Sequence, residues 1–177
     1  MKFSPSTVQA SYDSPLGRII LAAAHDRLTG VWFDGQSHQP DTARWPVDRD
    51  LPVLQQAKTQ LSAYFAGRRQ AFELALDLSA GTDFQQSVWR ALLQIPFGAT
   101  LSYGALSASI GKPAAVRAVA GAVARNPLSI IVPCHRVLGA GASLTGYAGG
   151  LPRKTALLQL EGASFKPEPN QPQEATP

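Results

Sequence analysis

One cysteine stands beside a histidine and an arginine in this 177-residue chain. Cys134 is the only cysteine of the sequence, and Pro133, His135 and Arg136 flank it. A lone cysteine is more often an inert buried side chain than a nucleophile. Cationic neighbours favour the thiolate, however, and the thiolate is the form that attacks carbon. Cys134 is therefore the first candidate for covalent chemistry.

Few carboxylates are available to orient His135. The acids after residue 80 are Asp83, Glu161, Glu168 and Glu174. Asp83 starts a predicted helix and the last two lie in a Pro-rich tail, which leaves Glu161, although it could equally be an exposed helix end. A carboxylate on one imidazole nitrogen makes the other a better base. Since adjacent residues of an extended segment point to opposite sides, we expect a water to link Cys134 and His135.

The net charge of +4 is unevenly distributed along the chain. Residues 1–80 hold eight basic and eight acidic residues, whereas residues 84–160 hold seven basic residues and no acid. Ordinary surfaces mix both signs, so this acid-free segment predicts a polyanionic partner. We favour nucleic acid over a phosphorylated metabolite.

Composition excludes several classes of protein. A single cysteine excludes a disulfide framework and any multi-cysteine metal site, and we expect neither metal nor cofactor. The N-terminus lacks the apolar run of a secretory signal. Residues 91–111 are uncharged, but Pro96 and several glycines interrupt them, so a spanning helix is not expected. We predict a cytoplasmic protein with no membrane contact.

The N-terminal half, residues 1–80, has the pattern of an α/β domain. Short β-rich runs at residues 8–12, 18–24 and 28–33 are separated by turn residues. Apolar residues with helical spacing follow up to Gly67, and the alternating residues 72–78 predict a final strand. His25 and His38 stand alone in or near turns, so we expect them to be solvated. Nothing else in this half suggests chemistry.

The C-terminal half, residues 81–165, is predicted to be helical. Thr82 and Gln85 form a capping-box pattern, and Ser102 can cap a short helix that ends at Gly111. Pro113 then opens a second helix that ends before Pro127, so the pair is a helix-turn-helix. Residues 128–138 are expected to form a buried strand, and a last helix ends at Glu161. We predict a disordered tail over residues 166–177.

The second helix of this pair has two different faces. Val116, Val119, Ala120 and Val123 should face the core, and the other face holds Ala114, Arg117, Ala118, Gly121 and Arg125. Small residues with two arginines suit close approach to a DNA backbone or groove. Tight helix–helix packing is the alternative explanation, and the acid-free segment favours DNA.

Several motifs, in this order, resemble one family. They are Ser14-Pro15-Leu16-Gly17, Phe97-Gly98, Ser102-Tyr103, Arg117-Ala118-Val119, Asn126-Pro127, Pro133-Cys134-His135-Arg136-Val137, Thr145-Gly146-Tyr147-Ala148-Gly149-Gly150 and Leu160-Glu161-Gly162. The chain thus resembles the O6-alkylguanine-DNA alkyltransferases, also called methylated-DNA–protein-cysteine methyltransferases, over almost its whole length.

The resemblance implies a fold and a reaction. The fold would be an α/β two-domain fold, with an N-terminal ribonuclease H-like domain of antiparallel sheet and helix and a C-terminal winged helix-turn-helix-like domain. A monomer would bind double-stranded DNA in the minor groove and flip out O6-alkylguanine, with O4-alkylthymine left open. Cys134 would take the alkyl group irreversibly, helped through water by His135 and Glu161. Flipping costs a few kcal/mol and is easiest for a badly paired base.

The resemblance also assigns residues to substrate binding. Arg117 would fill the gap left by the flipped base, and Tyr103 would crowd its phosphate. The pocket for guanine would involve Val137, Tyr147, Ala148 and Gly149, and the other expected contacts are Gly104, Lys112, Ala118, Asn126 and Arg136. Relatives with a structural zinc use N-terminal cysteines, which this chain lacks. Others have serine where Ala148 stands, so one side-chain hydrogen bond to the base is absent here.

Two other functions are compatible with parts of this pattern. A Cys-His hydrolase would turn over acyl substrates at Cys134, but it has no use for an arginine-faced helix. A helix-turn-helix regulator with an incidental cysteine would bind a specific DNA sequence whether or not Cys134 is present.

Overall fold

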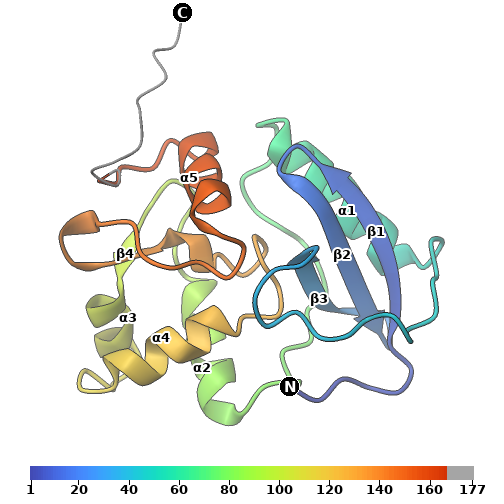
Figure 1. The fold of residues 1–177 in the computed structure, drawn as a ribbon, viewed down its shortest axis with the longest axis horizontal. Helices are drawn as coiled ribbons and strands as arrows, with labels where there is room; N and C mark the ends of the chain where they lie inside the picture. Colours follow the sequence, from blue (N-terminus) through green and yellow to red (C-terminus); the bar gives the residue numbers. More distant parts are fainter. Residues whose placement is uncertain (167–177) are drawn as a thin grey trace, which may run out of the picture.

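The N-terminal half is an antiparallel sheet backed by one helix (Figure 1). A computed structural model describes residues 1–166. Strands β1 (Val8–Ser14), β2 (Gly17–Ala24) and β3 (Arg27–Phe33) pair in the order β1-β2-β3, and helix α1 (Pro52–Phe65) contacts all three. Alternate residues of β2 face the core under α1, as a period of two requires. The three strands and the helix predicted here are confirmed.

The C-terminal half is built from short helices (Figure 1). These are α2 (Asp83–Leu92), α3 (Tyr103–Ser109), α4 (Val116–Ala124) and α5 (Leu151–Leu160). The predicted capping box is present at Thr82 and Gln85, and Ser102 accepts the backbone N–H of Ala105 at the start of α3. Trp89 of α2 donates its indole N–H to the carbonyl of Ala122 at 2.9 Å, which fixes α4 against α2.

Two short strands complete this half. Strand β4 (Leu101–Ser102) pairs in parallel with β5 (Val137–Leu138), and single 3-10 turns occupy η1 (Cys134–Arg136) and η2 (Ala140–Ala142). The α/β two-domain organisation expected from the sequence is therefore present. Within residues 1–166, no helix has the length and apolar character needed to cross a bilayer.

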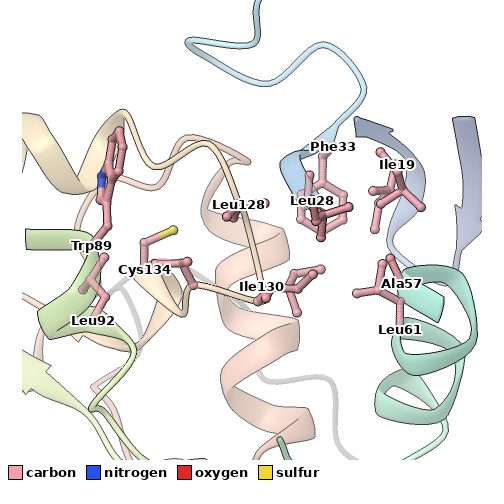
Figure 2. Close-up of a cluster of buried hydrophobic side chains, with 14 of the residues drawn as sticks. Ile19, Leu28, Phe33, Ala57, Leu61, Trp89, Leu92, Leu128, Ile130 and Cys134 are labelled. Carbon is pink, nitrogen blue, oxygen red and sulfur yellow. The ribbon is translucent and has the colours of Figure 1, made fainter. Parts of the chain in front are cut away.

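The two halves share one hydrophobic core. The backbone N–H of Val31 in β3 donates to Pro127, and that of Ser129 donates to Val31, at 2.8 and 2.9 Å. Figure 2 shows Leu128 and Ile130 between the apolar residues of the sheet and α1 on one side and Trp89 of α2 on the other. The chain segment that leads to Cys134 is thus packed from both domains.

Residues 72–78 do not form the predicted strand. The segment makes one parallel bridge, between Leu76 and Leu28, through backbone hydrogen bonds from Leu28 to Ala75 and from Asp77 to Leu28. Its alternating apolar residues are half-buried against the core, and this packing explains the period of two. Residues 127–129 take the next stretch of the same edge of β3, so a longer ladder has no room.

Residues 128–138 are not a continuous strand either. The N–H of Ile131 donates to Ser129 across Ile130, whose φ of 73° is rare for a β-branched residue. A second turn of this kind brings the N–H of Cys134 to the carbonyl of Val132. The chain therefore reaches Cys134 through tight turns, and Cys134 and His135 lie on a 3-10 turn, so the extended geometry expected for them was wrong.

The second helix of the helix-turn-helix starts later than predicted. Pro113 lies in a turn, and α4 begins at Val116, which is 37% exposed. Val119 and Val123 are buried as expected. Ala122 is also buried, whereas Val116, which was expected to face the core, is not. A later start moves the first turn of the helix out of the core, which leaves Val116 exposed.

The predicted tail is only partly described. Lys166, placed in the tail by the sequence prediction, donates its backbone N–H to Ala142 at 2.9 Å. Residues 167–177 lie outside the described residues.

Candidate active site

Cys134 lies at the start of η1 with 4% of its surface exposed. The side-chain amide of Asn126 donates to its Sγ at 3.0 Å and to the carbonyl of Val132 at 2.8 Å. Asn126 also accepts the N–H of Leu128, so a single buried side chain holds both ends of the turn segment. Asn126 was expected to contact DNA, but it is only 3% exposed and its partners are all within the protein.

Glu161 follows α5 directly and accepts hydrogen bonds from four residues. Its Oε1 receives the Tyr64 hydroxyl at 2.7 Å, His135 Nε2 at 2.9 Å and Arg136 Nη2 at 3.0 Å. Its Oε2 receives Arg136 Nε at 2.8 Å and the backbone N–H of Gly98 at 3.4 Å. We call these five residues the carboxylate cluster. The predicted contact between His135 and Glu161 is present, and the alternative of an exposed terminal Glu161 is wrong.

Gly98 is required by the close approach of this loop to Glu161. Its φ is 74°, and a Cβ there would lie 2.9 Å from the backbone oxygen of Glu161. Any other residue would therefore collide with the backbone carbonyl of Glu161 and adopt an unfavourable backbone conformation.

The carboxylate cluster fixes the protonation states of its members. Burial alone would raise the pKa of Glu161, but the hydrogen bonds from His135, Arg136 and Tyr64 outweigh it and lower that pKa to about 2. Burial lowers the pKa of His135 despite the opposing effect of Glu161, so the imidazole is neutral at pH 7. An ionised Glu161 can only accept, which places the imidazole proton on Nε2. His135 Nδ1 is then the basic atom, and it is buried without a protein partner in residues 1–166.

The thiol of Cys134 is less acidic than its neighbours in sequence suggested. Burial raises the pKa of Cys134, while the Asn126 hydrogen bond and the charge of Lys154 act in the opposite direction. Arg136 was expected to favour the thiolate and to contact DNA, but it is 6% exposed and paired with Glu161. Its positive charge is therefore neutralised within the cluster.

Lys154 is a functional candidate that sequence reasoning missed. Its side chain is fully buried, and its Nζ donates to the carbonyls of Val137 at 2.6 Å and Thr145 at 3.0 Å. Burial lowers the pKa of Lys154 to about 8, with the nearby Cys134 opposing the shift. Its position three and four residues before Leu157 and Leu158, on the inward face of α5, was the available signal.

Tyr64 is the second missed residue. It lies on α1 in the N-terminal domain, and its hydroxyl reaches Glu161 across 97 residues of sequence. Burial, followed by the charge of Glu161, raises the pKa of Tyr64 far above its usual range, so it remains a hydrogen-bond donor. A tyrosine in a row of buried helix positions was the signal, because a buried hydroxyl requires a partner.

A hollow of about 430 Å³ has Tyr103 and Tyr147 in its wall, two tyrosines close enough to Cys134 for its charge to act on them, and we call it the outer pocket. Its lining comes from α3 and α4, the loop before α5 and the N-terminal domain: Tyr103, Ala120, Ala124, Thr145, Gly146, Tyr147, Ala148, Ser37 and His38. His38 is exposed as predicted, but it borders this pocket. The volume lies in the range of small-molecule sites.

The expected pocket residues occupy different parts of this region. Tyr103, Tyr147 and Ala148 line the outer pocket. Burial raises the pKa of Tyr103 and, more strongly, that of Tyr147. Gly149 is packed so that a Cβ would lie 2.7 Å from the Tyr147 ring. Val137 is fully buried, its carbonyl accepts Lys154, and it does not line the outer pocket.

The exposed side of the helix-turn-helix carries the remaining candidates. Gly104, Lys112, Arg117, Ala118 and Arg125 are all exposed there. Of the seven cations in the acid-free segment, Arg136 and Lys154 are buried and Arg153 is half-buried, stacked over the Phe33 ring. The outward charge of the segment is therefore smaller than its sequence total. Within residues 1–166, no three His, Cys, Asp or Glu side chains gather as metal ligands.

Comparison with known proteins links both halves of the chain to one family. The model named "6-O-methylguanine DNA methyltransferase, ribonuclease-like domain" matches residues 7–78. The model for the DNA binding domain of the same family matches residues 83–163. These two matches agree with the predicted ribonuclease-like and helical DNA-binding domains.

Individual relatives cover most of the chain. The methylated-DNA–protein-cysteine methyltransferase of Mycobacterium leprae is 49% identical over 85% of this chain and 90% of its own length. The constitutive enzyme of Bacillus subtilis is 44% identical over 87% of this chain and 94% of its own.

Two crystal structures from Mycobacterium tuberculosis are closely similar. The O6-methylguanine methyltransferase has a TM-score of 0.81 and 48% identity, and the match covers 88% of this chain and 93% of that one. OGT in complex with DNA has a TM-score of 0.79 and 49% identity, and the match covers 86% and 91%.

Proposed function

This chain belongs to the 6-O-methylguanine DNA methyltransferase family, which repairs alkylated DNA by transfer to a cysteine, and we propose that Cys134 is the acceptor. The chain contains one cysteine. The observation that carries the assignment is the environment of its thiol. The thiol accepts a hydrogen bond from Asn126, and the next residue, His135, has a neutral imidazole that donates to the buried carboxylate of Glu161.

The buried His135 Nδ1, which has no partner in residues 1–166, supports a water-assisted proton transfer. A water between Cys134 Sγ and His135 Nδ1 would accept the thiol proton and pass one to the imidazole. Glu161, ionised and hydrogen-bonded at Nε2, would stabilise the resulting imidazolium. Lys154 would stabilise the thiolate through its charge. The raised pKa of Cys134 keeps the thiol protonated until these groups act together.

The transfer step then forms one bond and breaks another. The thiolate sulfur attacks the alkyl carbon, the S–C bond forms and the C–O6 bond breaks, and guanine leaves with the electron pair. The departing guanine anion would take up a proton from water, and the imidazolium would return the thiol proton to water, so that atoms and charge balance. The thioether is stable, and no group of the described site could cleave it, so each molecule would act once.

The substrate would be O6-alkylguanine in double-stranded DNA, bound by a monomer. Arg117, exposed on α4, would enter the duplex and fill the gap left by the flipped base. The outer pocket, with Tyr103 and Tyr147 in its wall, would receive the base. Lys112 and Arg125 would contact phosphates, which fits their exposure. Base flipping allows chemistry on an atom that is inaccessible inside the duplex.

Label counting tests this function. Duplex DNA carrying O6-methylguanine with a labelled methyl group is incubated with the protein, and label bound per chain is measured. We expect a plateau near one label per chain and none on Cys134→Ser, with DNA binding retained. Release of product beyond that plateau would instead support a Cys-His hydrolase. Sequence-specific binding without transfer would support a helix-turn-helix regulator.

A further inference from the structure

The N-terminal domain supplies part of the outer pocket. Ser37 and His38 lie in a turn of residues 36–39, between β3 and α1, and both line the hollow together with Ala120 and Ala124 of α4. We propose that this turn is part of the lesion-recognition surface, with Ser37 bordering the extruded base and His38 contacting its sugar-phosphate. The inference rests on the proposed function and extends it to a domain with no assigned role in recognition.

The turn is fastened to the catalytic half of the molecule. The backbone N–H of Ser37 donates to the carbonyl of Ala148, in the pocket loop, at 3.0 Å. The buried side chain of Gln36 accepts the N–H of Phe33 at 2.9 Å and the hydroxyl of Ser129 at 3.1 Å. Ser129 belongs to the segment that leads to Cys134. These bonds hold the turn at one position relative to the thiol.

The backbone at His38 is unusual for its residue type. His38 has a φ of 65°, in the left-handed region that favours glycine, and the N–H of Gln39 closes the turn on Gln36 at 3.3 Å. Such a conformation is unfavourable for a side chain with a Cβ and persists only where neighbouring contacts enforce it. Here it directs an exposed side chain to the rim of the pocket.

The chemistry of the two side chains fits an extruded nucleotide. An imidazole retains an N–H donor in either protonation state, and the strongest acceptors of a flipped nucleotide at the rim are its phosphate oxygens. Ser37 is small, and its side chain leaves the wall of the hollow open beside Ala148. A larger residue at position 37 would reduce the space for the alkylated base.

Replacement of His38 by Asn tests the rim contact. Asn adopts positive φ readily, so His38→Asn retains the turn and removes the imidazole. We expect the protein concentration for half-maximal repair of duplex O6-methylguanine to rise about five- to tenfold. The maximal rate should change little, and transfer from free O6-benzylguanine, which lacks a sugar-phosphate, should be unchanged.

His25 provides a matched control. It is another exposed turn histidine of the same domain, with a φ of 51°, and its ring lies 3.2 Å from the Ser6 hydroxyl and outside the outer-pocket lining. His25→Asn should therefore repair duplex DNA at the wild-type rate. An unchanged half-maximal concentration for His38→Asn, or equal losses on duplex and free base, would overturn the rim contact.

Replacement of Ser37 by Trp tests the wall. We expect Ser37→Trp to slow transfer from both duplex DNA and free O6-benzylguanine more than tenfold, with unchanged affinity for unmodified duplex and an unchanged thermal midpoint. Wild-type rates of transfer in Ser37→Trp would show that the turn is not part of the pocket wall. Failure of the wild-type protein to accept any label would overturn the proposed function and this inference together, whereas normal wild-type transfer with unaffected variants would overturn the inference alone.

Discussion

The carboxylate cluster and the outer pocket are two regions of opposite character. In the cluster, a guanidinium, a phenol and an imidazole are buried around one ionised carboxylate, and each donates a hydrogen bond to it. The outer pocket is open and lined by small, aromatic and hydroxyl-bearing residues, with His38 at its rim. Buried charges tolerate little change because each depends on its partner, whereas an open wall depends mainly on shape. We therefore expect substitutions in the cluster to reduce stability and those in the pocket to change substrate selection.

Glu161→Gln should have the largest effect. The change leaves Arg136 buried without its carboxylate, and we expect the free energy of unfolding to fall by about 3–5 kcal/mol, together with slower transfer and little change in DNA affinity. Urea denaturation measures the first effect and label transfer the second. Glu73→Gln, at an exposed glutamate of the N-terminal domain, is the control. If Glu161→Gln keeps the wild-type free energy of unfolding, the buried charges of the cluster do not depend on one another for stability.

Acid should destabilise the cluster before it affects the pocket. The folded-state pKa of Glu161 is about 2 against an ordinary value of 4.5, so its contribution is complete above pH 4.5 and is lost as the pH falls towards 2. The pKa of His135 is lowered from 6.5, so the unfolded state takes up its proton first and stability also falls below that pH. Thermal midpoints between pH 7 and 3 should decline, and Glu161→Gln should flatten the lower part of the curve.

Arg117→Ala tests the exposed face beyond the pocket. We expect repair of duplex DNA to fall by about tenfold to a hundredfold, because the flipped state loses the side chain that fills the gap. Transfer from free O6-benzylguanine and the unfolding free energy should be unchanged. Arg68→Ala, which makes the same charge change at the end of α1, should repair normally. Equal losses on duplex and free base would show that Arg117 does not act in flipping.

Lys154→Met tests a residue that contacts both regions, through Val137 beside Arg136 and through Thr145 of the outer pocket. Removal of the cation should raise the pKa of Cys134 further and slow transfer about tenfold at pH 7. In the wild type, the rate should rise with pH as the thiol ionises, until Lys154 loses its own proton near pH 8. The rise in the variant should be displaced to higher pH. Lys166→Met, at an exposed lysine, should retain the wild-type profile, and an undisplaced profile for Lys154→Met would limit Lys154 to packing.

Tyr64→Phe should have the smallest effect of the series. It removes one buried hydroxyl whose partner keeps other donors, so we expect a loss of about 1 kcal/mol in stability and transfer a few-fold slower. A double-mutant cycle with Glu161→Ala should give a coupling energy above zero, because both changes remove the same hydrogen bond. Additive losses would place Tyr64 outside the cluster.

The parts of this fold set by local sequence were predictable. The first three strands, the capping box at Thr82 and the Ser102 cap depend on neighbouring residues, and all are present. Glu161 was found by elimination, because the acid-free segment left almost no other carboxylate. The strand predicted at residues 72–78 is absent, because the alternation of its apolar residues reflects packing against the core and not pairing in a β-ladder.

The rest depended on contacts between residues distant in sequence. The sequence alone does not distinguish Arg136 and Lys154 from surface charges. In the structure, Arg136 donates to Glu161, and Lys154 donates to the backbone near Cys134. Tyr64 and the turn of residues 36–39 belong to a half with balanced charge and no motif of known chemistry. Their roles follow from how α1 and the β3–α1 loop meet the C-terminal domain, which no periodicity in the sequence records.

The shared core has a consequence for how the protein unfolds. The apolar residues of the sheet, α1 and α2 pack on the same Leu128–Ile130 segment, so neither half can expose its own interior without exposing the other (Figure 2). Calorimetry should therefore show one cooperative transition, and the slowest-exchanging amides of both halves should open with the same free energy. Two domains by sequence thus form a single thermodynamic unit, and removing the N-terminal one would leave the turns before Cys134 without their packing.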